Sequence, residues 1–328
     1  MRAIAPGRVN LIGDHTDYTG GLVFPMAIDR FTTIDADVRD TQTIELHSQD
    51  EEQDAIIQLP VTKDNSFASG WARYIAAVAS ECNPTRGIKG NISTTIPIGS
   101  GLSSSAALEV ATALALGFSG SASELARLAQ RAEHIATGVP TGIMDQLCIA
   151  SAKQHHAMLI DCNILEIEHI ALPENVQVLV RFITHRTLVG SQYADRVKQC
   201  AEAESIIGPL RKATLASVDS ISDLTTRIRA RHVISENQRV RDFALALKSN
   251  DLVTAGLLMN QSHTSLANDF STSTPAMDNA VSELQQTTGV FGARMTGGGF
   301  GGCVVALCSR DAQIEGWKVS AAGAAHIA

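Results

Sequence analysis

A loop rich in glycine and serine, residues 97–106 (PIGSGLSSSA), is the stretch of this sequence best suited to bind phosphate. Glycines let the backbone turn tightly and approach a ligand closely, and an apolar helical pattern follows over residues 104–117. The first N–H groups of a helix attract anions, and a serine hydroxyl can bind phosphate or ligate magnesium. The loop alone leaves one alternative to phosphate binding. It could be a turn that only caps the helix, through the side chain of one of its serines. The residues concerned are Gly99, Gly101, Ser103, Ser104 and Ser105.

Charged and polar residues gather in the N-terminal segment 5–21, between tight turns. Arg8 carries a permanent charge of the kind that stabilises a phosphoryl group in transfer. The acceptors of Asp14 and Asp17 and the switchable donor and acceptor of His15 suit a polyhydroxylated ligand. A polar loop with local side chain to backbone bonds is the alternative.

Two carboxylates lie on either side of a Gly/Pro turn at residues 138–142. Glu133 comes at the end of a predicted helix, and Asp145 comes at the start of the next one. A carboxylate beside a helix N-terminus stays ionised, as a metal ligand or a base must. A simple helix-end or capping role is the alternative for each. A second glycine cluster, residues 297–302, holds five glycines and predicts close backbone approach to a ligand or to another loop.

The elements that must position these residues fall into a strand-rich half and a helix-rich half. A boundary near residues 164–173 divides them into two predicted domains, 1–165 and 166–328. Strands are predicted at 32–38, 43–47, 92–96, 157–160 and 177–183, and short strands are predicted on both sides of the second glycine cluster. Helices are predicted at 104–117, 121–135, 190–205, 239–249 and 252–268, and one more opens at Thr274-Pro275 and ends at Gly289.

Composition excludes several classes of protein. The chain has 328 residues, 45% hydrophobic content and a formal net charge of -8, so it lacks the basic surface that nucleic-acid binding requires. No apolar stretch approaches the ~20 residues needed to span a bilayer, and the first residues lack the apolar core of a signal peptide. Six scattered cysteines without a CxxC pair predict reduced thiols in a cytoplasmic protein and argue against zinc. Adjacent His155 and His156 are typical of a turn entering a strand, where neighbouring side chains point apart.

Taken together and in this order, the motifs resemble the galactokinases of the GHMP small-molecule kinase superfamily, over nearly the whole chain. Residues 7–18 (GRVNLIGDHTDY) match the galactokinase signature, and residues 97–106 are similar to the family's phosphate loop. Residues 142–146 (GIMDQ) resemble its catalytic segment, and residues 294–303 resemble its third motif. Weaker similarity extends to residues 71–74, 191–193 and 231–236. The resemblance implies an α+β, two-domain GHMP kinase fold with the active site in the cleft between the domains.

The resemblance also implies a reaction, in which the γ-phosphate of Mg-ATP is transferred to the C1 hydroxyl of α-D-galactose. Asp145 would accept or orient the hydroxyl proton, and Arg8 would stabilise the γ-phosphoryl group. ATP and Mg2+ are the implied cofactors, no nucleic acid or membrane partner is expected, and a monomer is favoured. Arg8, Asp14, His15, Asp17, Gly142, Asp145 and Tyr193 would bind the sugar. Gly99, Gly101, Ser103, Ser104 and Trp71 would bind the nucleotide, and Ser105 and Glu133 would ligate magnesium.

The sequence departs from the family pattern in ways that bear on the sugar. Asp14 stands where galactokinases usually carry Glu, and Thr141 stands where they often carry Cys. The basic residue and the histidine before the tyrosine of the sugar pocket are reversed, as His185-Arg186. Two alternatives therefore stay open. One is a C1-kinase for arabinose, N-acetylgalactosamine or galacturonate, and the other is a catalytically silent sugar sensor on the same fold.

Overall fold

The first half of the chain forms five strands of a six-stranded sheet, and the C-terminal end of the chain adds the sixth. The computed structural model describes residues 1–62, 70–185 and 192–328. The strand order is β13-β1-β3-β6-β4-β5, antiparallel except for the β4–β6 pair. The strands are β1 (Arg2–Asn10), β3 (Pro25–Arg39), β4 (Thr43–Ser48), β5 (Ala55–Gln58), β6 (Gly87–Thr94) and β13 (His326–Ile327).

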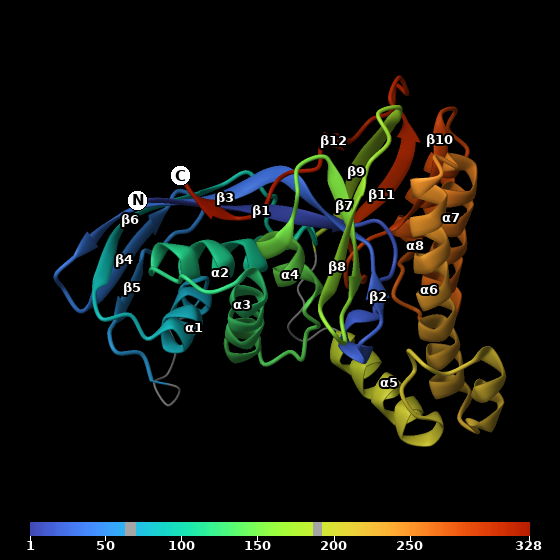
Figure 1. Ribbon diagram of the computed structural model, residues 1–328, viewed down its shortest axis with the longest axis horizontal. Coiled ribbons are helices and arrows are strands. Elements are labelled where there is room, and N and C mark those ends of the chain that lie inside the picture. Colours follow the sequence, from blue (N-terminus) through green and yellow to red (C-terminus); the bar gives the residue numbers. More distant parts are fainter. Residues whose placement is uncertain (63–69, 186–191) are drawn as a thin grey trace.

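Helices α1 (Ala72–Cys82), α2 (Ser104–Ala115) and α4 (Met144–Ser151) lie against this sheet, on its lower side in Figure 1, and α3 (Ala122–Thr137) packs on these helices. Helix α2 packs on β1 and β3 through small, fully buried side chains such as Ala107 and Ala111. Small residues let the helix come close to the strands, so the loop before α2 lies beside the end of β1. Helix α3 begins at a capping box in which Ser121 and Glu124 satisfy each other's backbone N–H groups.

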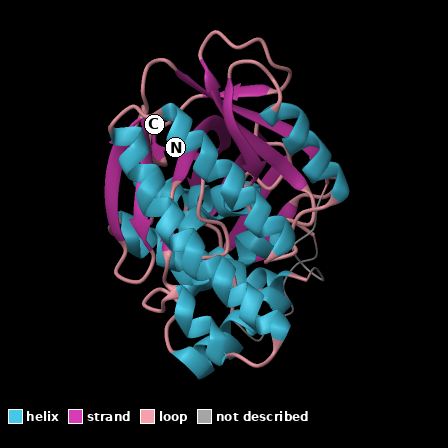
Figure 2. Cartoon of the chain, turned by 90° about the vertical axis from the view of Figure 1, so that its right-hand side faces the viewer, coloured by secondary structure: helices cyan, strands magenta, loops and turns pink. Residues whose placement is uncertain are grey.

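The second half joins a four-stranded antiparallel sheet, of order β10-β11-β9-β12, to a layer of helices. Seen from that side in Figure 2, the helices lie in front of the strands. The strands are β9 (Val176–Thr184), β10 (Val290–Met295), β11 (Gly302–Ser309) and β12 (Trp317–Val319). The helices are α5 (Tyr193–Ile207), α6 (Leu224–Lys248), α7 (Leu252–Asn268) and α8 (Pro275–Gln285), with the 3-10 turn η2 (Leu215–Ser220) between α5 and α6.

Helix α7 approaches β10 unusually closely. A Cβ atom at Gly256 would lie 2.0 Å from the Phe291 carbonyl oxygen, and one at Gly292 would lie 2.1 Å from the Gly256 carbonyl oxygen. Only glycine fits at both places, so the helix and the strand meet backbone to backbone. This contact holds β10, at whose end the third motif begins, against the helical layer.

The two halves are interleaved in sequence. A three-stranded sheet, β2 (Leu22–Val23), β7 (His156–Asp161) and β8 (Glu166–Ala171), lies between the two larger sheets in Figure 1. The β7–β8 hairpin pairs across residue 165, and β13 returns the end of the chain to β1 in the first sheet. Strands thus pair across the predicted boundary at residue 165, and the division into 1–165 and 166–328 stays a prediction.

Several predicted elements differ from those observed. The N-terminal segment begins as β1 and becomes a loop only after Asn10, and α1 was not predicted. Helix α6 begins at Leu224 rather than 239, because Asp223 caps it by accepting from the Thr226 amide. Helix α8 opens at Pro275 as predicted, but it ends at Gln285, before Gly289. The predicted helix 190–205 begins at Tyr193 in the described part of the chain, and residues 190 and 191 lie outside the described residues.

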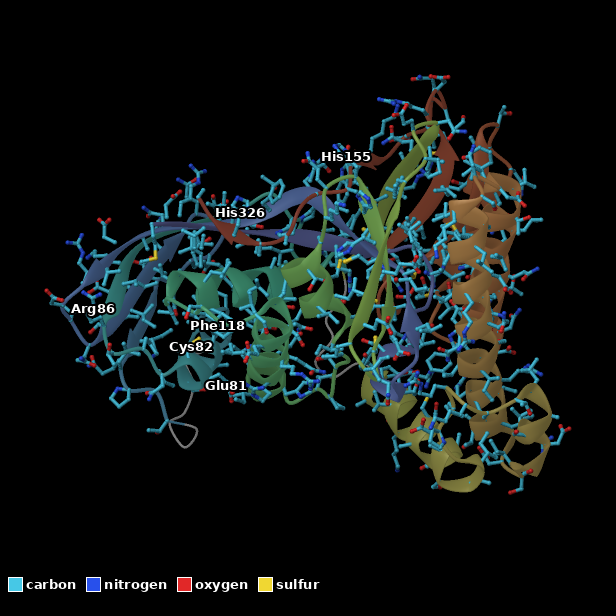
Figure 3. The ribbon with its side chains drawn as sticks, in the orientation of Figure 1. Glu81, Cys82, Arg86, Phe118, His155 and His326 are labelled. Carbon is cyan, nitrogen blue, oxygen red and sulfur yellow. The ribbon has the colours of Figure 1, made fainter. Side chains whose placement is uncertain are left out.

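The histidine pair lies where its spacing predicts. His155 has φ +64 in the turn, and β7 begins at His156 (Figure 3). Among the described residues, no helix combines the length and hydropathy needed to cross a bilayer.

Candidate active site

One cavity of about 360 Å³ is lined by every residue that the sequence marked for binding or catalysis. The phosphate loop, the N-terminal polar loop (residues 11–24), α4 and the start of α5 all contribute to its walls. The predicted residues on the wall are Arg8, Asp14, His15, Asp17, Trp71, Gly99, Gly101, Ser103, Ser104, Ser105, Glu133, Gly142, Asp145 and Tyr193.

Arg8 and Asp145 form a two-point ion pair on the wall of this cavity. Arg8 Nε donates to Asp145 Oδ1 and Nη2 donates to Oδ2, both over 2.6 Å. The Arg8 side chain is 3% exposed on β1, and the Asp145 side chain is 26% exposed in the first turn of α4. The carboxylate thus faces the cavity while the guanidinium supports it from behind. Oδ1 keeps a lone pair for a hydroxyl of a ligand, while Oδ2 also accepts from the Ser103 hydroxyl.

The glycine and serine loop turns tightly in front of α2. Gly99 and Gly101 have φ +73 and +80, and Ser103 is also left-handed at φ +63. The loop is bound to Arg8, whose Nη1 donates to the Gly101 carbonyl over 2.7 Å and whose backbone N donates to Leu102 O over 3.1 Å.

Ser103 is the N-cap residue of α2, as expected for Ser103 or Ser104, but its side chain does not make the capping bond. Its hydroxyl instead donates to Asp145 Oδ2 over 2.5 Å. The first N–H groups of α2 are therefore not capped by that hydroxyl. Such groups are suited to an anion.

Ser105 and Glu133 offer a pair of oxygen ligands on the same cavity wall. The Ser105 hydroxyl donates to Glu133 Oε1 over 2.9 Å, and Gln146 Nε2 donates to Oε2 over 2.5 Å. Burial, followed by the charge of Asp145, raises the pKa of Glu133 to about 7. A divalent cation beside Glu133 would offset the cost of burying its negative charge. Because Mg2+ prefers oxygen ligands and keeps several waters, two protein ligands fit it.

The polar loop is stabilised by its own backbone and by one buried hydroxyl. Leu11 N donates to Phe24 O and Phe24 N donates to Ile12 O, which closes the loop at its base. Thr16 Oγ1 contacts the carbonyls of Gly13 at 2.9 Å and Leu22 at 2.6 Å. The loop is therefore a built structure, and its polar side chains point into the cavity from a fixed frame.

Asp17 lies directly against Gly142. A Cβ atom on Gly142 would be 1.8 Å from Asp17 Oδ2, so only glycine fits at this position. Burial, followed by the charge of Asp145, raises the pKa of Asp17 to about 6, while hydrogen bonds from the Tyr18 and Met144 backbone lower it. Asp17 and Asp145 thus share one stretch of wall.

Aromatic rings surround His15, which has φ +66. The centre of its ring lies 5.3 Å from that of Tyr193 and 4.7 Å from that of Phe270. His15 Nδ1 is 3.1 Å from the Tyr18 hydroxyl. Rigid rings beside carboxylates are suited to a small polar ring with one apolar face.

Comparison with known proteins agrees with this geometry. Residues 1–36 match a family model described as the galactokinase galactose-binding signature. Residues 68–153 and 243–324 match the GHMP kinase N-terminal and C-terminal domains. A galactokinase of Chloroflexus aurantiacus is 40% identical, covering 97% of this chain and 88% of its own, and one of Homo sapiens is 38% identical, covering 94% and 83%.

The chain belongs to the galactokinase family. The structure of Lactococcus lactis galactokinase complexed with galactose superposes with a TM-score of 0.93 at 29% identity, over 99% of this chain and 94% of that one. Methanococcus jannaschii mevalonate kinase, at 22% identity and a TM-score of 0.73, shares the fold over 98% of each chain. The α+β GHMP kinase fold expected from the sequence is confirmed.

The departures from the galactokinase pattern have distinct surroundings. The Asp14 carboxylate accepts from the Gly297 amide over 2.9 Å and pairs with Arg294, so it is drawn back beneath the second glycine cluster. Thr141 lines the cavity, and its buried hydroxyl has no hydrogen-bond partner among the described residues. His185 packs edge-on against Phe182, and Arg186 lies outside the described residues.

Sequence reasoning missed several residues of this galactokinase site. Tyr74 on α1 and Thr94 on β6 line the cavity together with Ile98. Glu109, one turn after Ser105, is buried behind the wall, where burial and then the charge of Glu133 raise its pKa. Its place inside an alanine-rich helix was a signal, because a buried carboxyl on an apolar face needs an explanation. Arg294 and Glu236 were also given no role.

Proposed function

We propose that this protein transfers the γ-phosphoryl group of ATP to the C1 hydroxyl of α-D-galactose, giving ADP and galactose 1-phosphate. The observation that carries the proposal is the Arg8–Asp145 pair, which contacts the phosphate loop through Gly101 and Ser103 and faces the polar loop through Asp17. A phosphate site and a site for hydroxyl groups thus meet at one carboxylate.

The chain's own residues act mainly by position and charge, which is what phosphoryl transfer requires. Asp145 accepts a hydrogen bond from the C1 hydroxyl and orients its oxygen toward the γ-phosphorus. The new O–P bond forms as the bond to the β,γ-bridging oxygen breaks, and the hydroxyl proton passes to Asp145. Arg8 offsets the charge that develops on the transferring group.

The phosphates lie along Gly99, Gly101, Ser103 and Ser104, where backbone N–H groups and hydroxyls are available. Trp71, whose indole donates to Gln53 O over 2.9 Å, presents a flat surface toward the base end of the nucleotide. Ser105 and Glu133 would hold Mg2+, which when bound neutralises charge on the phosphates. We infer a cytoplasmic monomer with a sugar and ATP as its partners.

A sugar panel tests the proposal. ATP turnover is measured with galactose, L-arabinose, N-acetylgalactosamine and galacturonate, and the phosphorylated position is assigned by NMR. We expect the highest kcat/KM with galactose, and we expect the product to be phosphorylated at C1. Turnover of another sugar in preference would establish the rival C1-kinase, which the withdrawn carboxylate of Asp14 favours. Sugar binding without turnover would establish the silent sensor, against which the complete Arg8–Asp145 pair argues.

A further inference from the structure

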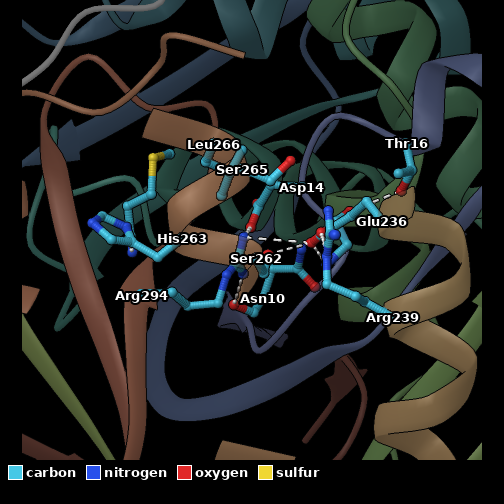
Figure 4. A network of polar contacts seen from close by, with 12 residues as sticks. Asn10, Asp14, Thr16, Glu236, Arg239, Ser262, His263, Ser265, Leu266 and Arg294 are labelled. Carbon is cyan, nitrogen blue, oxygen red and sulfur yellow. Dashed lines mark hydrogen bonds and ion pairs between the residues drawn. The ribbon is translucent and has the colours of Figure 1, made fainter. Parts of the chain in front are cut away.

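A cluster of fully buried charges lies behind the polar loop, outside the cavity wall. Figure 4 shows Arg294, from β10, between Asp14 of the polar loop and Glu236 of α6. The guanidinium of Arg294 pairs with Asp14 Oδ2, and its Nη2 is 4.0 Å from Glu236 Oε1. Arg294 and Glu236 are both 0% exposed, and neither lines the cavity. Asp14 is thus the point at which this cluster meets the sugar pocket.

Glu236 holds the backbone of the polar loop directly. Its Oε1 accepts the Gly13 amide over 3.0 Å and also the hydroxyl of Ser262 on α7. Its Oε2 accepts Arg239 Nε over 2.6 Å. Gly13 has φ +96, and a Cβ atom there would lie 2.8 Å from Leu22 O and from a Val240 methyl, so the amide that Glu236 binds sits on a backbone that only glycine adopts here.

Two more side chains of α6 bind the same loop. His232 Nε2 is 3.2 Å from the Asp14 carbonyl oxygen, and Asn237 Oδ1 accepts the Leu22 amide over 2.7 Å. Together with Glu236 they form one face of α6, which contacts the loop near its beginning and near its end. Asp14 is therefore fixed through its carbonyl, its carboxylate and the amide of the residue before it.

Buried charges are costly, and well-packed apolar residues in their place often leave a protein equally stable or more stable. Two carboxylates, Asp14 and Glu236, face two guanidiniums, Arg239 and Arg294. Burial disfavours the charged form of Glu236, but its charged and hydrogen-bonding partners, Arg239 foremost, outweigh burial and lower the pKa of Glu236 to about 2. Glu236 therefore stays ionised, whereas burial, against the charge of Arg294, raises the pKa of Asp14. The hydrogen bonds and ion pairs of this cluster fix the orientation of Gly13 and Asp14, which apolar packing cannot do.

We propose that Glu236 is a positioning residue for the sugar site, acting through the Gly13 amide and through Arg294 so that the polar loop presents Asp14, His15 and Asp17 at fixed places. The proposal rests on the sugar-kinase function proposed above. Helix α6 contributes no residue to the cavity wall. Under this proposal it nevertheless affects the affinity for the sugar and leaves the affinity for the nucleotide unchanged.

Two variants test it, because they change different properties of the same carboxylate. Glu236→Gln keeps the shape and the acceptor for Gly13 but removes the charge that faces Arg294. Glu236→Asp keeps the charge but withdraws it by about 1.5 Å, one carbon–carbon bond. Each should raise the KM for the sugar about tenfold or more, and the Kd for the sugar by calorimetry in the same proportion. The KM for ATP should stay within about twofold.

Val233→Ala is the matched control, since Val233 is fully buried on the same helix and packs in the apolar core. It should lower the melting temperature without separating the two KM values. Equal changes in both KM values for either Glu236 variant, or an unchanged sugar KM in the Asp variant, would overturn the proposal and leave Glu236 a stabilising residue. The sugar panel with the wild type tests the proposed function separately. If the wild type prefers a sugar other than galactose, the KM values of the variants are compared for that sugar.

Discussion

Arg8 binds Asp145 through two parallel hydrogen bonds, from Nε to Oδ1 and from Nη2 to Oδ2, each 2.6 Å long. The two residues are 137 positions apart, on β1 and α4. The remaining guanidinium nitrogen, Nη1, binds the Gly101 carbonyl. A planar, forked cation thus sets the position of the carboxylate relative to the phosphate loop, which a lysine in its place could not do with a single point charge.

The first prediction concerns the charge of Asp145. Asp145→Asn keeps the size of the side chain but removes its negative charge and one of its two acceptor oxygens, so it can no longer receive the proton of the sugar hydroxyl. We expect kcat to fall by about 10²-fold or more, while ATP still binds. Steady-state kinetics and calorimetry with ATP measure the two effects. Near-normal turnover would remove Asp145 from the mechanism and leave Arg8 and the metal site to account for catalysis.

A second prediction concerns the contact between Gly142 and Asp17. In Gly142→Ala the new Cβ would overlap Asp17 Oδ2 at 1.8 Å, so the carboxylate must move out of its place in the cavity. The KM for the sugar should rise about tenfold or more, because small displacements of positioning groups are costly. Gly323→Ala is the matched control, since a Cβ there meets nothing within 4 Å. If both variants bind sugar as the wild type does, Asp17 is not a sugar ligand.

The local part of this site could be predicted from the sequence, and the long-range part could not. The loop before α2 and the turn before α4 have glycine, proline and helical spacing that specify their backbone locally. Ser103 shows the limit, since its type favours capping but a partner 42 residues away takes its hydroxyl. The bond from the Gly13 amide to Glu236 spans 223 residues, and no local pattern encodes it.

Two elements were missed for related reasons. Strand β1 has polar residues toward its end, Arg8 among them, and such residues are typical of a loop. They are buried only because they bind partners elsewhere in the chain, which the local sequence does not reveal. The first half of α6 carries Arg229 and His232 on a buried face, which hides its apolar pattern. In both cases the side chains that break the expected pattern are ones that bind other segments, so the departures mark the site and its support.

The third prediction follows from the raised pKa of Asp17. Its folded value of about 6 lies above the usual 3.8, so the folded protein binds the proton more tightly than the unfolded chain. The free energy of unfolding of the ligand-free protein should therefore decrease as the pH rises from about 4 to 6. Asp17→Asn should stabilise the protein by about 1 to 2 kcal/mol at pH 7.5 and not at pH 4, allowing for one weakened hydrogen bond.

Urea denaturation at the two pH values measures this effect, with the exposed Asp40→Asn as control. Sugar binding by calorimetry should weaken in Asp17→Asn even as stability rises, since the site gives up a carboxylate. A variant less stable than the wild type at pH 7.5 would show that the backbone hydrogen bonds of Asp17 outweigh the cost of burying its charge.

The last prediction concerns Asp14, the departure that bears most directly on the sugar. Its Oδ1 accepts the Gly297 amide over 2.9 Å and its Oδ2 pairs with Arg294, so the carboxylate is held at the back of the pocket. By resemblance, the longer Glu of other galactokinases reaches a distal hydroxyl of the hexose. We expect that contact to be made through a bridging water or to be absent here, which would cost about 0.5–1.5 kcal/mol and would lower affinity without abolishing recognition.

We therefore expect the wild type to prefer galactose to L-arabinose, which lacks the C6 hydroxymethyl group, because His15, Asp17 and Tyr193 still line the pocket. Asp14→Glu should increase the ratio of the two kcat/KM values, by up to about tenfold, provided that the longer side chain keeps its bond to Gly297. Competition kinetics with the two sugars measure the ratio, and Gly323→Ala again serves as the control. A wild type that prefers arabinose, with galactose preference created by Asp14→Glu, would mean that this carboxylate has been shortened to fit a pentose.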